Sequence, residues 1–518
     1  MSLAPEPLPD DPDQLRARLA SLSAERDEAR AEVDKLQLLI SELQRMQFGR
    51  RSEQRDPDQM QLGLEDQEQA EGEDEAAEKA GSPDAERQTR QRAKPKRNRG
   101  HLPKHLPRIE RIIEPEEKAC PCCAGQMHVI GEDKSEQLDI IPAKLQVIVT
   151  RRPRYGCRAC EGAVVQALAP DRPMTGGMAT PGFLAHVLVS KYADHCPLYR
   201  QSEILTRSGI ELDRSTLANW IGKTCWWLRP VYEHLMETVL QCSKIFADET
   251  TLPVLKPGNG KTKCGYLWGY AVDDRPWVGP SPPLVVYVYA DGRGGKHVAK
   301  HLERFSGVVQ VDAYPGYNIL EKENRSVGPI KLVFCWTHLR RRFYDFHKST
   351  GSPIAGEAMD RIGKLYAIEK KIRGFPAKHR QIIRDRESRP IVDDLKPWLE
   401  KQHGRLSAKS KLAEAIAYAL NRWDGFTSFL DDGRIELDTN VLERAIRPIV
   451  LTRKNALFAG SDRGAVHWAI ASSIIQTCRL NHVEPFAYLK DILERMVSGQ
   501  TKANQIDELM PWNWQQAS

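Results

Sequence analysis

The strongest constraint on the fold is a series of apolar runs of strand length, bounded by turn residues. These runs predict five strands, at residues 244–250, 266–272, 284–289, 307–312 and 332–335. A segment with helical periodicity, residues 295–305, lies between the third and fourth runs, and a short helix is expected around Ile319. The order βββαβαβ therefore predicts one α/β core.

Three carboxylates occupy positions in this pattern where they could hold a divalent metal. Asp248 interrupts the first run, Asp312 ends the fourth run just before a turn, and Glu443 lies in a helix-like stretch. Two aspartates on strands and a glutamate on a helix can converge on a pair of Mg²⁺ ions that activate a nucleophile at a phosphodiester. Taken alone, each carboxylate is also explained by a turn or cap role.

Length and charge indicate several domains and a polyanionic partner. A chain of 518 residues is too long for one hydrophobic core. The net charge is only +6, yet residues 65–86 are almost purely acidic and residues 87–111 almost purely basic. Such asymmetry is typical of a protein that binds a polyanion.

The apolar and cysteine patterns favour a cytoplasmic protein. The sequence has no N-terminal apolar signal segment, and no apolar run approaches the roughly 20 residues that span a bilayer, so no membrane partner is expected. In a reducing compartment the 11 cysteines are expected to be thiols or metal ligands. Four scattered cysteines are expected in the core: Cys196, Cys225, Cys242 and Cys478.

The N-terminus, residues 12–50, carries a heptad pattern that predicts a coiled coil joining protomers. Its seam contains Leu15, Leu22, Ala29, Leu36 and Leu43, with Leu19, Val33 and Ile40 at the intervening positions and Arg26 as a polar interruption that can set the register. The alternative is a helix that packs against its own protein. Residues 54–100 are polar and charge-blocked, which predicts a disordered linker whose basic end, residues 94–99, either binds phosphates or only aids solubility.

Two C-x₂-C pairs in residues 101–170 predict a zinc-binding module. Cys120, Cys123, Cys157 and Cys160 supply the four thiolates of a closed, structural Zn²⁺ site, which leaves Cys122 as an extra thiol. A strand expected at residues 145–149 would carry the chain between the two pairs. A redox pair is the alternative, but no βαβ pattern surrounds these cysteines.

Residues 180–235 favour a helix-turn-helix region that binds DNA. Two helices are expected on either side of residues 208–212, and the second begins after Asp213 as N-cap. The side chains expected to face a DNA groove are Arg214, Ser215, Thr216 and Asn219. An ordinary helical hairpin fits the same pattern.

Particular tracts make a family resemblance specific. The strand order with acids on the first and fourth strands resembles the ribonuclease H-like core of retroviral-type integrases and DDE transposases. Residues 438–448 (DTNVLERAIRP) and 453–461 (RKNALFAGS) closely resemble the insertion sequence 66 family of bacterial transposases. Further matching tracts are residues 102–108 (LPKHLPR), 192–195 (YADH), 248–250 (DET), 335–341 (CWTHLRR) and 485–489 (PFAYL).

This resemblance implies a multidomain α+β protein: a coiled coil, a zinc-containing module, a helix-turn-helix region and a catalytic core interrupted by a helical insertion. The core would comprise residues 243–345 and 435–495, and the insertion, residues 346–434, explains the roughly 130 residues between Asp312 and Glu443. The resemblance assigns Asp248, Asp312 and Glu443 as the catalytic and metal-binding triad. Cys196 and Thr337 depart from the family pattern, and neither is a proposed ligand.

Basic residues near the acids are candidates for DNA contacts. His338, Arg340 and Arg341 could position phosphates, or could belong to a solvated helix start. Arg447, Arg453 and Lys454 follow Glu443 closely and are expected to bind DNA, although surface charges on helices are common.

The expected function is Mg²⁺-dependent cleavage at the 3′ ends of an insertion sequence, followed by strand transfer into target DNA, with Mn²⁺ able to replace Mg²⁺. The expected partners are double-stranded DNA at the transposon ends and target, other copies of the chain, and element-encoded auxiliary proteins. Two alternatives remain open: an inactive DNA-binding regulator and a plain metal-dependent nuclease. The intact triad argues against the regulator.

Overall fold

The structure is a computed structural model that describes residues 108, 110, 144–156, 164–256, 258, 260–322, 325–407 and 410–515. The predicted coiled coil (12–50), the predicted linker (54–100) and the four predicted zinc ligands lie outside the described residues.

A mixed five-stranded sheet forms the centre of the described chain. Its strands are β3 (Lys244–Lys256), β4 (Lys261–Val272), β5 (Leu284–Ala290), β6 (Gly307–Val311) and β7 (Ile330–Phe334), in the spatial order β5-β4-β3-β6-β7. Strands β3, β4 and β5 are antiparallel neighbours, whereas β6 and β7 run parallel to β3. Continuous buried runs in these strands show that both faces are covered by other elements. The five predicted strands are confirmed.

Helices on the sheet include α6 (Gly295–His301), η2 (Pro315–Asn318), α7 (Ile319–Lys322), α14 (Asn440–Ala456) and α15 (Asp462–Leu480). Helix α15 covers the edge strand β5 with hydroxyl groups. The backbone N–H of Val285 donates to Thr477 Oγ1 at 3.2 Å, and that of Tyr287 donates to Ser473 Oγ at 2.8 Å. These contacts satisfy edge amides that would otherwise be free to pair with another chain.

A second group of helices flanks this core: α3 (Pro181–Tyr192), α4 (Leu198–Arg207), α5 (Arg214–Gln241), α16 (Pro485–Val497) and η5 (Ala503–Leu509). Helices α4 and α5 lie on either side of the predicted turn. Asp213 is the N-cap residue of α5 but makes no side-chain cap hydrogen bond. Helix α5 continues through Pro230 to Gln241, so the second predicted helix is 28 residues long.

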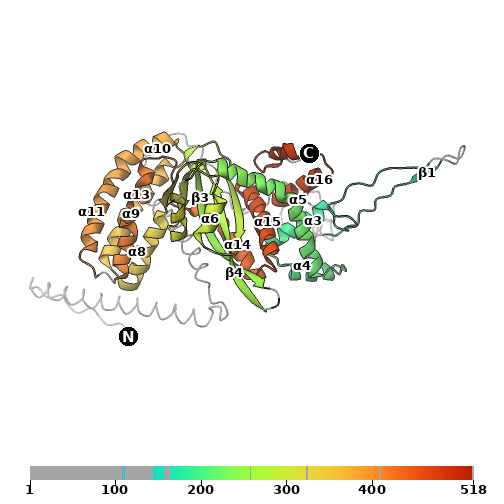
Figure 1. Ribbon diagram of the computed structural model, residues 1–518, viewed down its shortest axis with the longest axis horizontal. Helices are drawn as coiled ribbons and strands as arrows, with labels where there is room; N and C mark the ends of the chain where they lie inside the picture. The colour runs from blue at the N-terminus through green and yellow to red at the C-terminus, as the bar shows by residue number, and fades with distance from the viewer. Residues whose placement is uncertain are drawn as a thin grey trace, which may run out of the picture. The chain divides into compact units, whose positions relative to one another are not determined.

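Between β7 and α14 the chain forms helices throughout. They are α8 (Trp336–Thr350), α9 (Pro353–Ile372), α10 (Ala377–Ile383), the π-helical turn η3 (Arg384–Ser388), α11 (Arg389–His403), α12 (Lys411–Leu420), α13 (Trp423–Thr427) and η4 (Ser428–Leu430). In Figure 1 the yellow and orange helices α8, α9, α10 and α11 group together beside the sheet.

The strand predicted between the two cysteine pairs is absent from the described residues. Residues 145–149 do not form the predicted strand, and their apolar side chains are exposed. A short antiparallel pair forms instead between β1 (Arg154–Gly156) and β2 (Val164–Gln166). A strand needs a partner for its backbone groups, and no segment of the described chain pairs with residues 145–149.

Of the four cysteines expected in the core, Cys225 and Cys478 are buried, whereas Cys196 and Cys242 are only half-buried. No helix among the described residues is long and apolar enough to cross a membrane.

Candidate active site

The strand register places Asp248 and Asp312 on neighbouring strands at the same level of the sheet. Phe246 of β3 is paired with Gln310 of β6, and each aspartate lies two residues further along the chain, Asp248 within β3 and Asp312 directly after the end of β6. Because side chains alternate along a strand, both carboxylates leave the same face of the sheet. Both residues are half-buried. The register alone therefore brings these two predicted site residues together.

Backbone amides orient both aspartates. The N–H of Glu249 donates to Asp248 Oδ1 at 2.7 Å, and the N–H of Tyr314 donates to Asp312 Oδ1 at 2.8 Å. The second bond requires a sharp turn, which Ala313 makes at φ 69°, in the left-handed region that a residue with a side chain rarely adopts. A strained residue next to a half-buried carboxylate is typical of a functional site.

Glu443 lies in the first turn of α14 and is 8% exposed. The Thr439 hydroxyl donates to Glu443 Oε1 at 2.9 Å, and His338 Nδ1 lies 3.9 Å from the same oxygen. Ligand atoms of Cys335, His338 and Glu443 all lie within 4.8 Å of one another. The imidazole of His338 is therefore adjacent to the acids, and its Nδ1 has no hydrogen-bond partner among the described residues.

Close packing against the sheet sets the position of α14. Gly269 of β4 is paired with Asp248, and a Cβ at that glycine would lie 3.0 Å from Leu442 Cδ1. The missing side chain lets Leu442, and with it Glu443, approach the sheet beside Asp248. The hydroxyl of Tyr287 on β5 then donates to Ala445 O at 2.6 Å, which fixes the next turn of α14.

The segment leading into α14 is held by the sheet and by the helices before it. Gln310 Nε2 donates to the carbonyls of Glu436 at 2.7 Å and Asp438 at 3.1 Å. Arg380 forms an ion pair with Glu436 at 2.6 Å, and Arg384 donates to three backbone carbonyls between residues 429 and 435. The helices that precede α14 therefore help to place Glu443.

The neighbouring carboxylates make the ionised form of Asp248 less stable. Burial raises the pKa of Asp248 well above its usual value, and the negative charges of Asp312, Glu249 and Glu443 raise it further, while His338 opposes them. Burial lowers the pKa of His338, but Cys335, Glu443 and Asp312 outweigh it, so the net shift is upward. Buried oxygen ligands that repel one another are the donor set that a hard divalent cation stabilises, so these residues fit Mg²⁺.

Three linked residues that the sequence did not single out, Glu249, Arg293 and Tyr317, lie near Asp312. Glu249 follows Asp248 on the opposite face of β3, and its buried carboxylate accepts hydrogen bonds from Arg293 Nε at 2.6 Å and from the Tyr317 hydroxyl at 2.7 Å. Burial and Asp312 raise the pKa of Glu249. The tract containing Glu249 was visible in the sequence, but its partners are 44 and 68 residues away.

The basic residues predicted to bind DNA fall into different settings. Arg341 pairs with Asp345 at 3.0 Å, one turn along α8, and Arg340 lies half-buried on the same helix. On α14, Arg447 is exposed and Lys454 is half-buried.

Arg453 is placed differently from expectation. It is 7% exposed, and its guanidinium donates to Thr250 Oγ1 at 3.2 Å and to Thr251 Oγ1 at 2.6 Å. These bonds join α14 to β3. The guanidinium of Arg453 therefore holds the helix against the strand, and its predicted contact with DNA stays a prediction.

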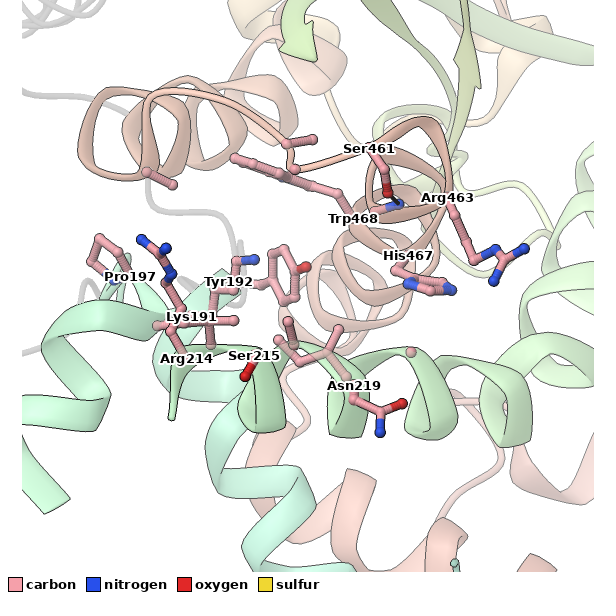
Figure 2. Close-up of a pocket in the computed structure, with 18 of the residues that line it drawn as sticks. Lys191, Tyr192, Pro197, Arg214, Ser215, Asn219, Ser461, Arg463, His467 and Trp468 are labelled. Carbon is pink, nitrogen blue, oxygen red and sulfur yellow. Dashed lines mark hydrogen bonds between the residues drawn. The ribbon is translucent and has the colours of Figure 1, made fainter. Parts of the chain in front are cut away.

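Most of the residues predicted to face DNA in the helix-turn-helix region line a groove in the protein itself. Arg214, Ser215 and Asn219 on α5 form one wall of a groove of about 1120 Å³, and Thr216 is not part of the lining. The opposite wall comes from residues 456–468, including Ser461, Arg463 and His467 (Figure 2). The two predicted helices are present, but three of the four predicted polar residues face another part of the same chain.

Comparisons with known proteins cover most of the sequence. Residues 176–467 match the family described as “Transposase IS66 family”, and residues 473–512 match the “IS66 C-terminal element”. Residues 117–161 match the “zinc-finger binding domain of transposase IS66”, and residues 35–111 match “Transposase C of IS166 homeodomain”, a leucine-zipper family.

Curated relatives from Sinorhizobium fredii are similar along nearly their whole length. The “Uncharacterized protein y4jD” is 45% identical over 99% of this chain and 98% of its own. The “Uncharacterized protein y4qI” is 43% identical over 98% of both chains. A family match across more than half of the sequence, together with these relatives, places the chain in the IS66 family of DDE transposases.

Proposed function

We propose that this transposase cleaves phosphodiester bonds at the 3′ ends of its insertion sequence and joins the freed 3′-hydroxyls to target DNA, using a ribonuclease H-like core. The observation that supports this most strongly is the register of β3 and β6, which sets Asp248 beside Asp312 while α14 brings Glu443 to the same face. This is the arrangement of acids that the family resemblance implies.

In this proposal Asp248, Asp312 and Glu443 hold Mg²⁺, or Mn²⁺ in its place. When bound, the metal supplies activation of the nucleophile and neutralises charge on the phosphodiester. The amides of Glu249 and Tyr314 orient the two aspartates, and the Thr439 hydroxyl orients Glu443, so the oxygens are positioned before substrate arrives.

Cationic side chains around the acids would bind the DNA backbone. Exposed Arg447 lies one turn beyond Glu443 on α14, and Lys454 follows two turns later. Arg340 and Arg341 approach from α8, and we propose that they contact phosphates together with His338.

The N-terminal region would assemble the complex. We propose that Cys120, Cys123, Cys157 and Cys160 bind one structural Zn²⁺ and that the leucine-zipper region joins protomers so that two element ends are processed together. Changing Leu22, Leu36 and Leu43 to Glu should then lower the mass measured by light scattering; an unchanged mass would exclude the seam as the assembly element.

The test of the chemistry is cleavage of double-stranded DNA carrying the element's own ends. Asp248→Asn, Asp312→Asn and Glu443→Gln should each abolish Mg²⁺-dependent cleavage with little loss of DNA binding, because an amide of the same size is a poor metal ligand. Exposed Asp291→Asn is the matched control and should cleave normally.

Two outcomes would count against the proposal. Near-normal cleavage by either aspartate variant would reject the triad. DNA binding without cleavage by the wild-type protein, in Mg²⁺ and in Mn²⁺, would instead favour an inactive regulator.

A further inference from the structure

The groove between α5 and residues 456–468 is strongly cationic. Its lining includes five basic side chains, Lys191, Arg214, Lys223, Arg229 and Arg463, and one carboxylate, Asp213. The basic residues come from α3, α5 and the start of α15, which are far apart in the sequence. Figure 2 shows Arg214 and Arg463 on opposite walls. Cations gathered on facing walls are typical of a site that tracks a phosphate backbone.

Lys191 is a largely buried cation in the lining of this groove. Its Nζ lies 4.9 Å from the ring centre of Tyr192 and 5.6 Å from that of Trp468, and no carboxylate pairs with it among the described residues. Burial lowers the pKa of Lys191 to about 8. A buried ammonium without a counterion is costly, and an anion in the groove would relieve that cost.

His467, on the opposite wall, lies close enough to three of these cations for their charges to act on it. It is half-buried, and its pKa is lowered by burial and by the charges of Arg229, Arg463 and Lys191. Arg229, Arg463 and Lys191 therefore all act on this one side chain of the groove, and of the three Arg229 also pairs with Glu233 at 4.0 Å.

The groove also offers exposed aromatic surface. Trp226 is 65% exposed, Tyr199 42% and Phe458 40%, and all three side chains line it. Exposed aromatic rings gathered in one groove are typical of a surface that binds a ligand. In duplex DNA the flat faces of the bases are already stacked, whereas in an unpaired strand they are free to stack on such rings.

We propose that this groove binds a single-stranded DNA segment, with Lys191, Arg214 and Arg463 holding phosphates and Trp226 stacking on an unpaired base. The choice of DNA rests on the function proposed above. The groove is separate from the acid cluster, since none of Asp248, Asp312 and Glu443 is among its lining residues. It would hold a strand that has been separated from its complement near a processed end.

The test measures binding of a fluorescent oligonucleotide of about 20 nucleotides, and of the matching duplex, to the full chain carrying Asp248→Asn in a metal-free buffer. Arg214→Ala with Arg463→Ala should weaken single-strand binding at least tenfold and lower the slope of log affinity against log salt by about 1.4, or about 0.7 for each phosphate contact. Trp226→Ala should weaken single-strand binding by about 5- to 150-fold and leave duplex binding unchanged.

Lys401→Ala, an exposed lysine on α11 outside the groove, is the control and should bind like its parent. A second measurement does not depend on affinity. Ultraviolet crosslinking to a strand containing 5-iodouracil should produce adducts on peptides that contain Trp226, Tyr199 or Phe458, because the reagent reacts with aromatic rings in contact with the base.

Each other outcome overturns a defined part of the inference. Unchanged single-strand binding in the arginine double variant, or adducts found only elsewhere in the chain, rejects the groove as a nucleic-acid site. Equal losses for duplex and single strand, with no effect of Trp226→Ala, makes it a duplex site instead. If wild type fails to cleave but the groove variants still lose single-strand binding, only the proposed chemistry is wrong.

Discussion

Gly269→Ala should impair catalysis without touching an acid. The new methyl group would lie 3.0 Å from Leu442 Cδ1 and 3.3 Å from the Tyr287 ring. The ring cannot easily move away, because its hydroxyl is bonded to Ala445 O. Leu442 is fully buried, which leaves its side chain little room to rotate, so helix α14 should shift and Glu443 with it.

The distances set the size of the effect. Carbon atoms pack best at about 3.5–4.0 Å, so relief of the contact requires a shift of roughly 0.5–1 Å. A misplacement of about 1 Å can reduce a rate by about 100-fold, so we expect Mg²⁺-dependent cleavage to fall by about 10- to 100-fold. Overpacking should also lower the free energy of unfolding by about 1–3 kcal/mol.

The assay is single-turnover cleavage with saturating DNA. Gly363→Ala makes the same chemical change on α9 with no neighbour within 4 Å, and should leave cleavage unchanged. Leu442→Val removes the δ-carbons and should restore much of the activity when combined with Gly269→Ala. Cleavage by Gly269→Ala within twofold of wild type would refute this account of how α14 is placed.

Three other perturbations test separate features. Arg384→Met removes a fully buried guanidinium bonded to a glutamate and three carbonyls, and should lower the free energy of unfolding, measured in urea, by about 3–5 kcal/mol. The control Arg386→Met, at an exposed arginine, should change it by no more than about 0.5 kcal/mol. Burial and two nearby cationic groups lower the pKa of His301 to about 4. The neutral imidazole should therefore contribute about 3 kcal/mol to the free energy of unfolding above pH 6.5, and this contribution should be lost as the pH falls to 4. His301→Gln should flatten the dependence of the thermal midpoint on pH across that window, and an unchanged slope would contradict this account. Serine at Cys123 or Cys160 should abolish the binding of one Zn²⁺ and expose the N-terminal module to protease, and zinc-free wild-type protein by elemental analysis would exclude the site.

The strands were predictable because each core run is apolar and ends at turn residues. The predicted and observed strands differ where the apolar pattern is weak or has no partner strand. The β3–β4 hairpin continues through pairs such as Lys256 with Lys261, which are polar and were not recognised as strand. Residues 145–149 have the opposite problem, since β-branched composition predicted a strand for which the described chain provides no partner.

The acids were predictable and their supports were not. Asp248 and Asp312 are visible because one interrupts and the other ends an apolar run, within tracts that resemble a known family. The role of Gly269 depends on its pairing with Asp248, and that of Gln310 on a turn 126 residues away, so neither can be read locally. The packing role of Arg453 was not visible for the same reason, because its partners on β3 lie about 200 residues earlier in the sequence.

Helix α14 links the acid site to the groove. It carries Glu443 in its first turn and ends at Ala456, which lines the groove. At 1.5 Å per residue these positions are about 20 Å apart along one helix. Leu442 and Arg453 pack this helix against the sheet near its two ends, so it has little freedom to tilt. A strand held in the groove would therefore reach the acids at a fixed spacing, and binding there would contribute to positioning the scissile phosphate as well as to affinity.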